Sequence, residues 1–255
     1  MIKLQFLGSG SAFVPISENY QSNMILQSES GKRLLIDCGT DARHSITPLG
    51  LSQRDIDCVY ISHHHADHVG GLEWLAFTTY FDPAAKKPSM MIHPSLVDRL
   101  WNNVLSGGLQ SLEGDKPATL DDYFDILPCN DDDSFTWESI HIHLIKTIHV
   151  YNGHELLPSY GLFFKTDKNT VFISTDTQFK PELYMQYYHQ ADIIFHDCET
   201  TAHKGCVHAH FTQLATLDPA IKAKMWLYHY STSTRFDAVA NGFRGFVAKG
   251  QSFML

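Results

Sequence analysis

Four side chains that commonly bind metal ions lie close together in one segment of the sequence. His63, His65, Asp67 and His68 directly follow an apolar run that ends at Ser62, and two glycines come after them. Imidazole and carboxylate groups are ligands of Zn²⁺ and similar divalent ions. A solvated polar loop is the alternative interpretation, but four ligand types so close together favour a metal site at the end of a strand.

Three further candidate ligands occupy equivalent places later in the chain. The sequence contains 16 histidines, so position rather than number has to identify them. His149, Asp176 and His229 each follow a short apolar run of the kind that forms strands. Each could by itself be a polar surface residue, and His154 is an alternative to His149. Taken with the first segment, the three residues would complete the coordination of two ions.

The elements that must position these residues alternate between strands and helices. Apolar, β-branched runs predict strands at 2–7, 24–26, 33–37, 58–62, 90–93, 140–148, 161–166, 170–175, 192–196 and 225–228. Helical patterns occupy 71–81, 94–105, 181–189 and 211–217. This mixture predicts one α/β domain over residues 1–255, with helices packed on sheets. Residues 83–138 are the least patterned, and we expect an insertion, a lid or an oligomer contact there.

Composition and charge limit the possible partners. Of 255 residues, 44% are hydrophobic and 18% are charged, which is an ordinary globular balance. No apolar run is long enough to predict a membrane span. The net charge of −9 argues against a long RNA or DNA partner, since nucleic-acid binding needs a basic surface. The five cysteines show no CxxC spacing, which predicts reduced thiols in a cytoplasmic protein.

The first segment resembles a known family motif. His63-His-His-Ala-Asp-His68 matches the HxHxDH motif of the metallo-β-lactamase superfamily, and the later candidates appear in the family's order. The segments 158–161 and 174–177 are similar to its ribonuclease Z and phosphodiesterase branch. The resemblance implies an αβ/βα sandwich with two divalent ions at the edge where strands end, Zn²⁺ in preference to Mn²⁺. It also implies one ligand set for each ion: His63, His65 and His149 for the first, Asp67, His68 and His229 for the second, and Asp176 as the bridge.

The same resemblance implies a hydrolytic reaction at phosphorus. Di-iron redox relatives carry Glu at the position of His65, and many true β-lactamases carry a Cys ligand at the position of Asp176. Two ions about 3.5–4 Å apart can instead hold a phosphoryl group and activate water.

The proposed catalytic residues also follow from the resemblance. A histidine near a late helix start is the expected general acid. His210 is the first candidate because it lies two residues before Thr212, and His208 is the second. Asp197 would orient that histidine, and Asp67 is counted as catalytic as well as a ligand. The alternative is that the two histidines only pack in the core or lie on the surface.

Two features favour a small phosphodiester over tRNA. Ribonuclease Z relatives bind tRNA with a long basic arm between the ligands that correspond to His149 and Asp176, and this chain has only a short interval there. The overall charge is also unsuited to a long nucleic acid.

The segments 71–75, 226–231 and 242–251 are similar to the anti-Pycsar proteins of phages and bacteria. Those relatives hydrolyse 3′,5′-cyclic nucleotides such as cCMP and cUMP, and often cAMP and cGMP. The resemblance implies a homodimeric enzyme that yields nucleoside 5′-monophosphates, evades cyclic-nucleotide-based antiviral immunity, and works in the cytoplasm, the host's if it is phage-encoded. The alternatives are a ribonuclease Z-like RNA 3′-processing endonuclease and a nucleotide-binding protein that does not cleave.

Overall fold

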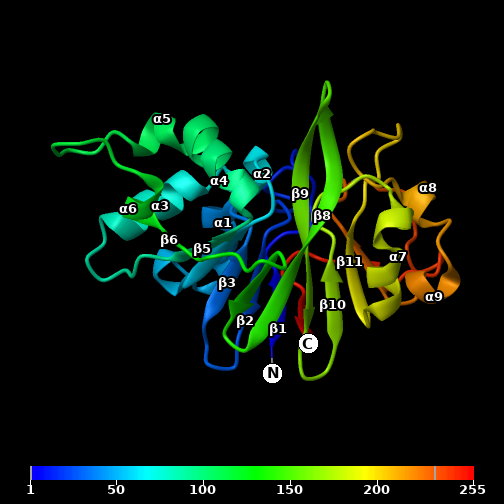
Figure 1. Cartoon of the computed structure of the whole chain (residues 1–255). Coiled ribbons are helices and arrows are strands. Elements are labelled where there is room, and N and C mark those ends of the chain that lie inside the picture. The colour runs from blue at the N-terminus through cyan, green and yellow to red at the C-terminus, as the bar shows by residue number, and fades with distance from the viewer. Residues whose placement is uncertain (1, 233) are drawn as a thin grey trace.

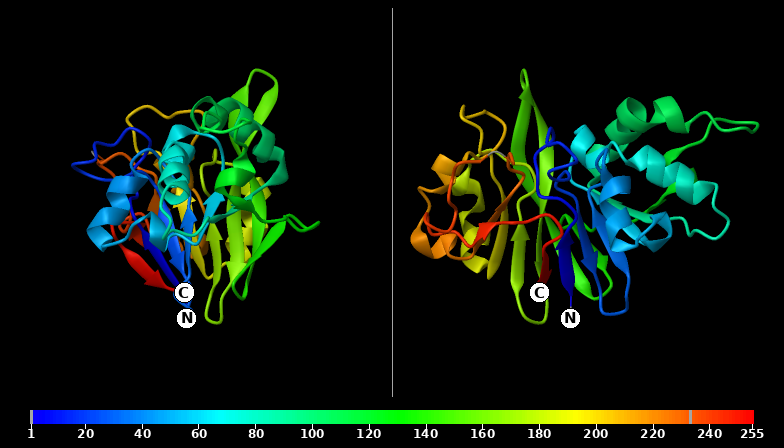
Figure 2. Two further views of the ribbon diagram at one scale, coloured as in Figure 1. Left: turned by 90° about the vertical axis from the view of Figure 1, so that its left-hand side faces the viewer. Right: turned by 180° about the vertical axis from the view of Figure 1, so that it is seen from behind.

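Two seven-stranded sheets pack face to face, and helices cover their outer faces (Figure 1). The computed structural model describes residues 2–232 and 234–255. The strand order is β14-β1-β2-β3-β4-β5-β6 in the first sheet and β13-β12-β11-β10-β9-β8-β7 in the second. The helices of the two layers lie on opposite sides of the molecule, with both sheets between them, as the view from behind also shows (Figure 2). The predicted αβ/βα sandwich is confirmed.

The first layer contains the N-terminal half of the chain and the last strand. Its strands are β1 (Lys3–Phe6), β2 (Met24–Gln27), β3 (Arg33–Ile36), β4 (Cys58–Ile61), β5 (Ser89–Ile92), β6 (Asp125–Ile126) and β14 (Ser252–Met254). Its helices are α1 (Ala42–Ile46), α2 (Ala66–Val69), α3 (Leu72–Tyr80), α4 (Pro94–Leu100), α5 (Ser106–Leu109) and α6 (Leu120–Tyr123). Two 3₁₀ turns, η1 (Thr47–Leu49) and η2 (Gln53–Asp55), and a π-helical turn, η3 (Trp101–Leu105), complete it.

The second layer contains most of the C-terminal half. Its strands are β7 (Ser134–Trp137), β8 (Ile140–Asn152), β9 (Glu155–Lys165), β10 (Thr170–Ile173), β11 (Ile193–Asp197), β12 (Met225–Tyr228) and β13 (Gly245–Phe246). Its helices are α7 (Pro181–Gln190), α8 (Phe211–Leu214) and α9 (Pro219–Lys222). The β8–β9 hairpin is the longest strand pair and projects beyond the body of the sandwich (Figure 1).

Strand direction brings the predicted ligands to one edge. In the first sheet β3, β4 and β5 run parallel, and in the second sheet β10, β11 and β12 do. β8 is antiparallel to β9, which is antiparallel to β10, so β8 runs in the same direction as β10. Because the carboxyl ends of parallel strands meet at one edge of a sheet, the loops after these strands are neighbours.

All ten predicted strands and all four predicted helices are present, and the segment 83–138 is more integrated than expected. It supplies β5 and β6 to the first sheet and β7 to the second. Met90, Met91 and Phe135 from these strands are buried. β5 was predicted, whereas β6 has only two residues and β7 follows three aspartates, so neither of these gave a strand pattern in the sequence. The stretch between α5 and α6 does extend away from the body (Figure 1).

Two general expectations concern membranes and thiols. Among the described residues, no helix combines the length and apolarity that crossing a membrane requires. Cys38, Cys58, Cys129, Cys198 and Cys206 are all free thiols.

Phe6 on β1 joins the two sheets. Its fully buried ring lies with its centroid 5.2 Å from that of Phe195 on β11 and 5.4 Å from that of Tyr228 on β12. The contact links the first sheet to the strands that carry Asp197 and His229, so the packing of the sandwich also sets the relative position of the two halves of the site.

We expect Phe6→Ala to lower the free energy of unfolding by about 3–5 kcal/mol, because it opens a cavity between the sheets. Denaturant unfolding of the metal-free protein measures this. Phe13→Ala is the control, since Phe13 is 96% exposed and its loss should change the free energy by less than about 0.5 kcal/mol. Equal effects of the two substitutions would contradict the assigned role of Phe6.

Candidate metal centre

Strained backbone marks three of the turns at the edge where the ligands meet. Asp37 after β3, Thr175 after β10 and His229 after β12 have φ values of 62°, 51° and 63°. Side chains other than glycine rarely adopt this left-handed conformation, and it costs about 1–3 kcal/mol per residue. Surrounding structure holds these turns, and each of them places a polar side chain in, or next to, the ligand cluster.

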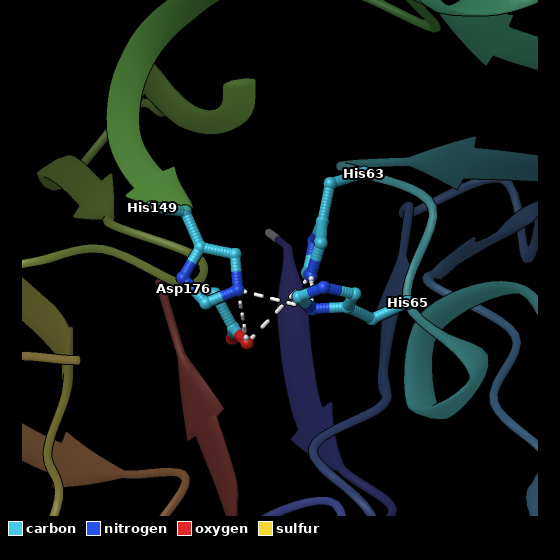
Figure 3. A group of neighbouring side chains, drawn as sticks. All are labelled: His63, His65, His149 and Asp176. Atoms are coloured by element: carbon cyan, nitrogen blue, oxygen red, sulfur yellow. Dashed lines mark hydrogen bonds and ion pairs between the residues drawn. The ribbon is translucent and has the colours of Figure 1, made fainter. Parts of the chain in front are cut away.

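The first ligand set comes from both sheets (Figure 3). The loop after β4 carries His63 and His65, and the end of β8 carries His149. His65 Nδ1 lies 3.1 Å from His63 Nε2 and 3.0 Å from His149 Nε2. Asp176 Oδ2 lies 3.7 Å from His63 Nε2 and from His149 Nε2. These four ligand atoms form one compact group.

The second ligand set is fully buried and shares a residue with the first. Its members are Asp67, His68, Asp176 and His229. Asp67 Oδ2 lies 3.2 Å from His68 Nε2 and 3.3 Å from His229 Nε2. The same oxygen that faces the first set, Asp176 Oδ2, lies 3.3 Å from His68 Nε2 and 3.5 Å from His229 Nε2. One carboxylate oxygen therefore lies between the two groups.

Hydrogen bonds outside the cluster hold the histidine rings in one tautomer. His149 Nδ1 donates to the carbonyl oxygen of Val207 at 2.8 Å. His68 Nδ1 donates to Asp37 Oδ2 at 2.7 Å. Because Nδ1 donates to an outside acceptor in both rings, Nε2 is the nitrogen that faces the cluster and is available to a cation.

Ser62 extends the same arrangement to His63. Its hydroxyl donates to Asp37 Oδ2 at 2.8 Å and so accepts from His63 Nδ1 at 3.0 Å. The lone pair of His63 Nε2 consequently also faces the cluster. Asp37 thus orients both histidines from outside the two ligand sets.

The donor atoms fit divalent cations. Ligands bound tetrahedrally at 2.0–2.1 Å are about 3.3–3.4 Å apart. The atom pairs given above are 3.0–3.7 Å apart, and all atoms of each set lie within 4.8 Å of one another. Among the described residues, no hydrogen bond satisfies His68 Nε2 or Asp176 Oδ1, although both atoms are buried. Such groups need a partner, and a bound cation is the partner that lone pairs from all sides require.

The cluster divides its histidines by charge. Burial lowers the pKa of His149 to about 4, which keeps the ring neutral. Burial alone would also lower the pKa of His68, but the carboxylates of Asp176 and Asp67 outweigh it and raise that pKa well above its usual value. Burial alone would raise the pKa of Asp176, but the facing histidines lower it more strongly. Asp176 is therefore a carboxylate. The acidic members are therefore ready to bind cations.

His208, the second candidate for the general acid, lies beside the cluster. Its Nδ1 donates to Asp197 Oδ2 at 2.8 Å. Its ring centroid lies 4.9 Å from that of His149 and 4.7 Å from that of His229. Burial alone would lower the pKa of His208, but the negative charge of Asp197 outweighs this effect and raises the pKa. Asp197 also contacts His229, with Oδ1 at 3.4 Å from Nδ1.

His210, the first candidate for the general acid, makes local hydrogen bonds at the start of α8. His210 is the N-cap of α8, and its Nδ1 accepts from the backbone N–H of Thr212 at 3.2 Å. Its Nε2 donates to the carbonyl oxygen of Thr201 at 3.1 Å. Both ring nitrogens are therefore occupied by local contacts. His154, the alternative to His149, is exposed in the turn of the β8–β9 hairpin.

Sequence reasoning missed Asp37, Ser62 and the carbonyl of Val207 as supporting residues. Asp37 had a detectable signal, because it follows an apolar run and precedes Cys-Gly, as the ligands follow theirs. Gly39 in this turn lies so near Asp67 that a Cβ would be 2.1 Å from its backbone oxygen. A backbone carbonyl such as that of Val207 has no signature in sequence.

Comparison with solved structures agrees with this fold. The metallo-beta-lactamase fold protein YhfI of Bacillus subtilis matches with a TM-score of 0.75 at 17% identity, covering 100% of both chains. The short form of human tRNase Z matches with a TM-score of 0.69 at 18% identity, covering 99% of this chain and 98% of that one. Fold and ligand clusters together define a protein of the metallo-β-lactamase fold with a site suited to divalent metal ions.

Comparison of sequences identifies the family within that fold. The sequence model of the anti-Pycsar protein Apyc1 family matches residues 2–253. The anti-Pycsar protein Apyc1 of Paenibacillus sp. (strain J14) is 35% identical over 257 residues, covering 100% of this chain and 99% of the relative. The chain belongs to the anti-Pycsar protein Apyc1 family.

We expect elemental analysis of the purified protein to give close to two divalent ions per chain. Asp176→Ala removes the shared oxygen and should reduce the content at both positions without changing the circular dichroism spectrum, since the core does not include this residue. Asp132, His141 and His143 form a separate, largely exposed group that lies outside the two ligand sets.

His141→Ala/His143→Ala is therefore the control, and it should retain two ions. A metal content near zero in protein prepared without chelators would contradict the assignment. So would full metal content in Asp176→Ala.

Proposed function

We propose that the protein is a dinuclear metal-dependent phosphodiesterase that hydrolyses 3′,5′-cyclic nucleotides to nucleoside 5′-monophosphates. The observation that carries this proposal is the position of Asp176 Oδ2, 3.3–3.7 Å from four histidine nitrogens that belong to two ligand sets. Two divalent ions bound there would hold a phosphoryl group between them and supply an activated water. Zn²⁺ is the first candidate metal, because histidine and aspartate ligands suit it, and Mn²⁺ is the second.

The chain's charge and its connections support a small substrate over tRNA. The stretch from His149 to Asp176 is occupied by the end of β8, by β9 and by β10, so it forms a hairpin and a core strand instead of a long basic arm. The net charge of −9 is unfavourable for a polyanion. A cyclic mononucleotide carries a single phosphate charge, which two ions can neutralise without a basic surface.

The family supports the nucleotide class and the biological role. Its relatives are named anti-Pycsar proteins. On this basis the substrates are cCMP and cUMP first, with cAMP and cGMP also accepted. The enzyme would act in the cytoplasm, that of the host if the gene is viral, and would counter cyclic-nucleotide-based immunity.

His208 is the proposed proton donor to the leaving oxygen. Asp197 orients the ring by accepting from Nδ1, so Nε2 is the atom left to face substrate. The ring lies against His149 and His229, one from each ligand set. A group in that place is within reach of a phosphate held by both ions, whereas His210 is held at the start of α8.

The test is a metal-loaded sample assayed against cyclic nucleotides, a tRNA precursor and bis(p-nitrophenyl) phosphate. We expect hydrolysis of the cyclic nucleotides and none of the tRNA precursor. His208→Ala should lower kcat by about 10²–10⁴-fold with its metal content intact, because a general acid contributes about that factor. His210→Ala is the matched comparison and should mainly lower stability, by about 1 kcal/mol, through loss of the helix cap.

Cleavage of the tRNA precursor instead of cyclic nucleotides would favour the RNA-processing alternative, and binding without cleavage would favour a nucleotide-binding protein. A larger loss of kcat in His210→Ala than in His208→Ala would return the proton-donor role to His210.

The proposal includes a homodimer in which part of 83–138 helps to close the partner's site. The stretch between α5 and α6 extends away from the sandwich and is available for such a contact (Figure 2). Sedimentation at micromolar concentration should show a species near twice 28.9 kDa. A monomer with full activity would rule the dimer out as a requirement.

A further inference from the structure

A cavity of about 440 Å³ opens directly beside the first ligand set. His63, His65 and His149 form part of its lining. Its volume falls within the range of about 300–1,000 Å³ that is typical of small-molecule sites. A molecule whose phosphate lay at the ligand cluster would therefore have space for its remaining atoms here.

Two elements from different sheets form the walls of this cavity. One wall is α4 and includes Arg99, and the other is the β8–β9 hairpin and includes Glu155, Leu156 and Leu157. Arg99 Nη2 lies 2.5 Å from Glu155 Oε1, and this ion pair joins the two walls. The two walls are thus in direct contact.

Stacked rings and a hydrogen bond also join the α4 side to β9. The rings of His93 and Tyr160 stack with centroids 4.1 Å apart and planes 11° apart. The Tyr160 hydroxyl and Ser95 Oγ are 3.0 Å apart and share a hydrogen bond. These contacts restrict the wall before any ligand binds, which reduces the entropic cost of binding.

The lining combines cations with apolar side chains. Lys146 on β8 and Arg99 carry positive charge, and Glu155 carries the one negative charge of the lining. Because Glu155 pairs with Arg99, the lining has a net excess of one positive charge, which Lys146 supplies next to the ligand cluster. It attracts small anions, and lysine offers only hydrogen-bond donors, which suit the carbonyl and hydroxyl oxygens of a nucleoside. Leu156 and Leu157 provide an apolar surface for a base or ribose.

We propose that this cavity is the nucleoside subsite of the enzyme, with Lys146 as a residue that determines selectivity for nucleotides over other phosphodiesters. The inference rests on the proposed function, since it places the nucleoside of a cyclic mononucleotide next to the phosphate position. A larger cavity, of about 1,170 Å³, is lined by residues such as Ile140 and Lys165 and by none of the seven ligands in the described part of the chain. It lies toward the start of β8, whereas His149 lies near the other end, so it does not serve this substrate.

The experiment compares two substrates in the metal-loaded enzyme. Values of kcat/KM are measured for cCMP and for bis(p-nitrophenyl) phosphate, which contains no nucleoside, and their ratio defines the selectivity. Lys146→Met should lower the selectivity about tenfold, chiefly through the KM for cCMP, as expected for loss of one charge-assisted hydrogen bond. Leu156→Trp should lower it too, because the larger side chain fills the cavity.

Lys165→Met is the matched control. Lys165 is an exposed lysine at the far end of β9 and should retain the wild-type selectivity. If both Lys146→Met and Leu156→Trp keep the wild-type ratio within about twofold, the subsite lies elsewhere and the inference is overturned.

A second measurement separates this inference from the proposed function. If the wild-type enzyme cleaves bis(p-nitrophenyl) phosphate but not cyclic nucleotides, the proposed function fails. Cytidine 5′-monophosphate is then tested as a competitive inhibitor of bis(p-nitrophenyl) phosphate hydrolysis. A Ki that rises about tenfold in Lys146→Met supports the subsite, and an unchanged Ki rejects it.

Discussion

Lone pairs that converge inside a protein repel one another unless a cation lies between them. The edge of the sandwich where the ligands meet is built around that constraint. His63, His68 and His149 all have their Nδ1 protons committed to outside acceptors, so their Nε2 atoms face inward, where a cation can bind them. Carboxylates of Asp67 and Asp176 face the same points. Burial makes this arrangement costly without a cation and favourable with one. The strained turns at Asp37, Thr175 and His229 are part of the same cost.

The site depends on the packing of the two sheets, because neither sheet contains a complete ligand set. The loop after β4 in the first sheet provides His63, His65, Asp67 and His68, and the second sheet provides His149, Asp176 and His229. Aromatic contacts of Phe6 with Phe195 on β11 and Tyr228 on β12 hold the two sheets together. These two strands end at Asp197 and directly before His229. A shift between the layers would separate Asp176 from the histidines of the first sheet. Stability of the core and geometry of the site are consequently linked.

Charge is distributed so that a generally acidic protein has a locally cationic approach to its ligand cluster. Lys146 and Arg99 lie in the cavity next to the first ligand set, while the acidic excess is elsewhere, including the stretch from Asp121 to Glu138. This arrangement disfavours a long polyanion, which would contact much of the acidic surface, and tolerates one phosphate. It is the physical basis for proposing a mononucleotide substrate within the anti-Pycsar protein Apyc1 family.

The sequence by itself predicted the strand ends that carry the ligands, because each apolar run there stops directly before His or Asp. The sandwich, the ten main strands and the grouping of His63, His65, Asp67, His68, His149, Asp176 and His229 followed from these local patterns and the family motif. The edge strands β6, β7, β13 and β14 did not, since β6, β13 and β14 have only two or three residues and β7 follows three aspartates instead of lying in an apolar run.

Only the tertiary structure shows how the surroundings of His208 and His210 differ. The two residues lie in one short loop, where spacing cannot show which ring turns toward the ligands. The start of α8 uses both nitrogens of His210, and Asp197, distant in sequence, orients His208 instead. The roles of Asp37 and of the Val207 carbonyl, and the cavity between α4 and the hairpin, likewise depend on contacts between residues far apart in the chain. Local sequence determines which residues can do chemistry, and the packing of distant segments determines which of them meet.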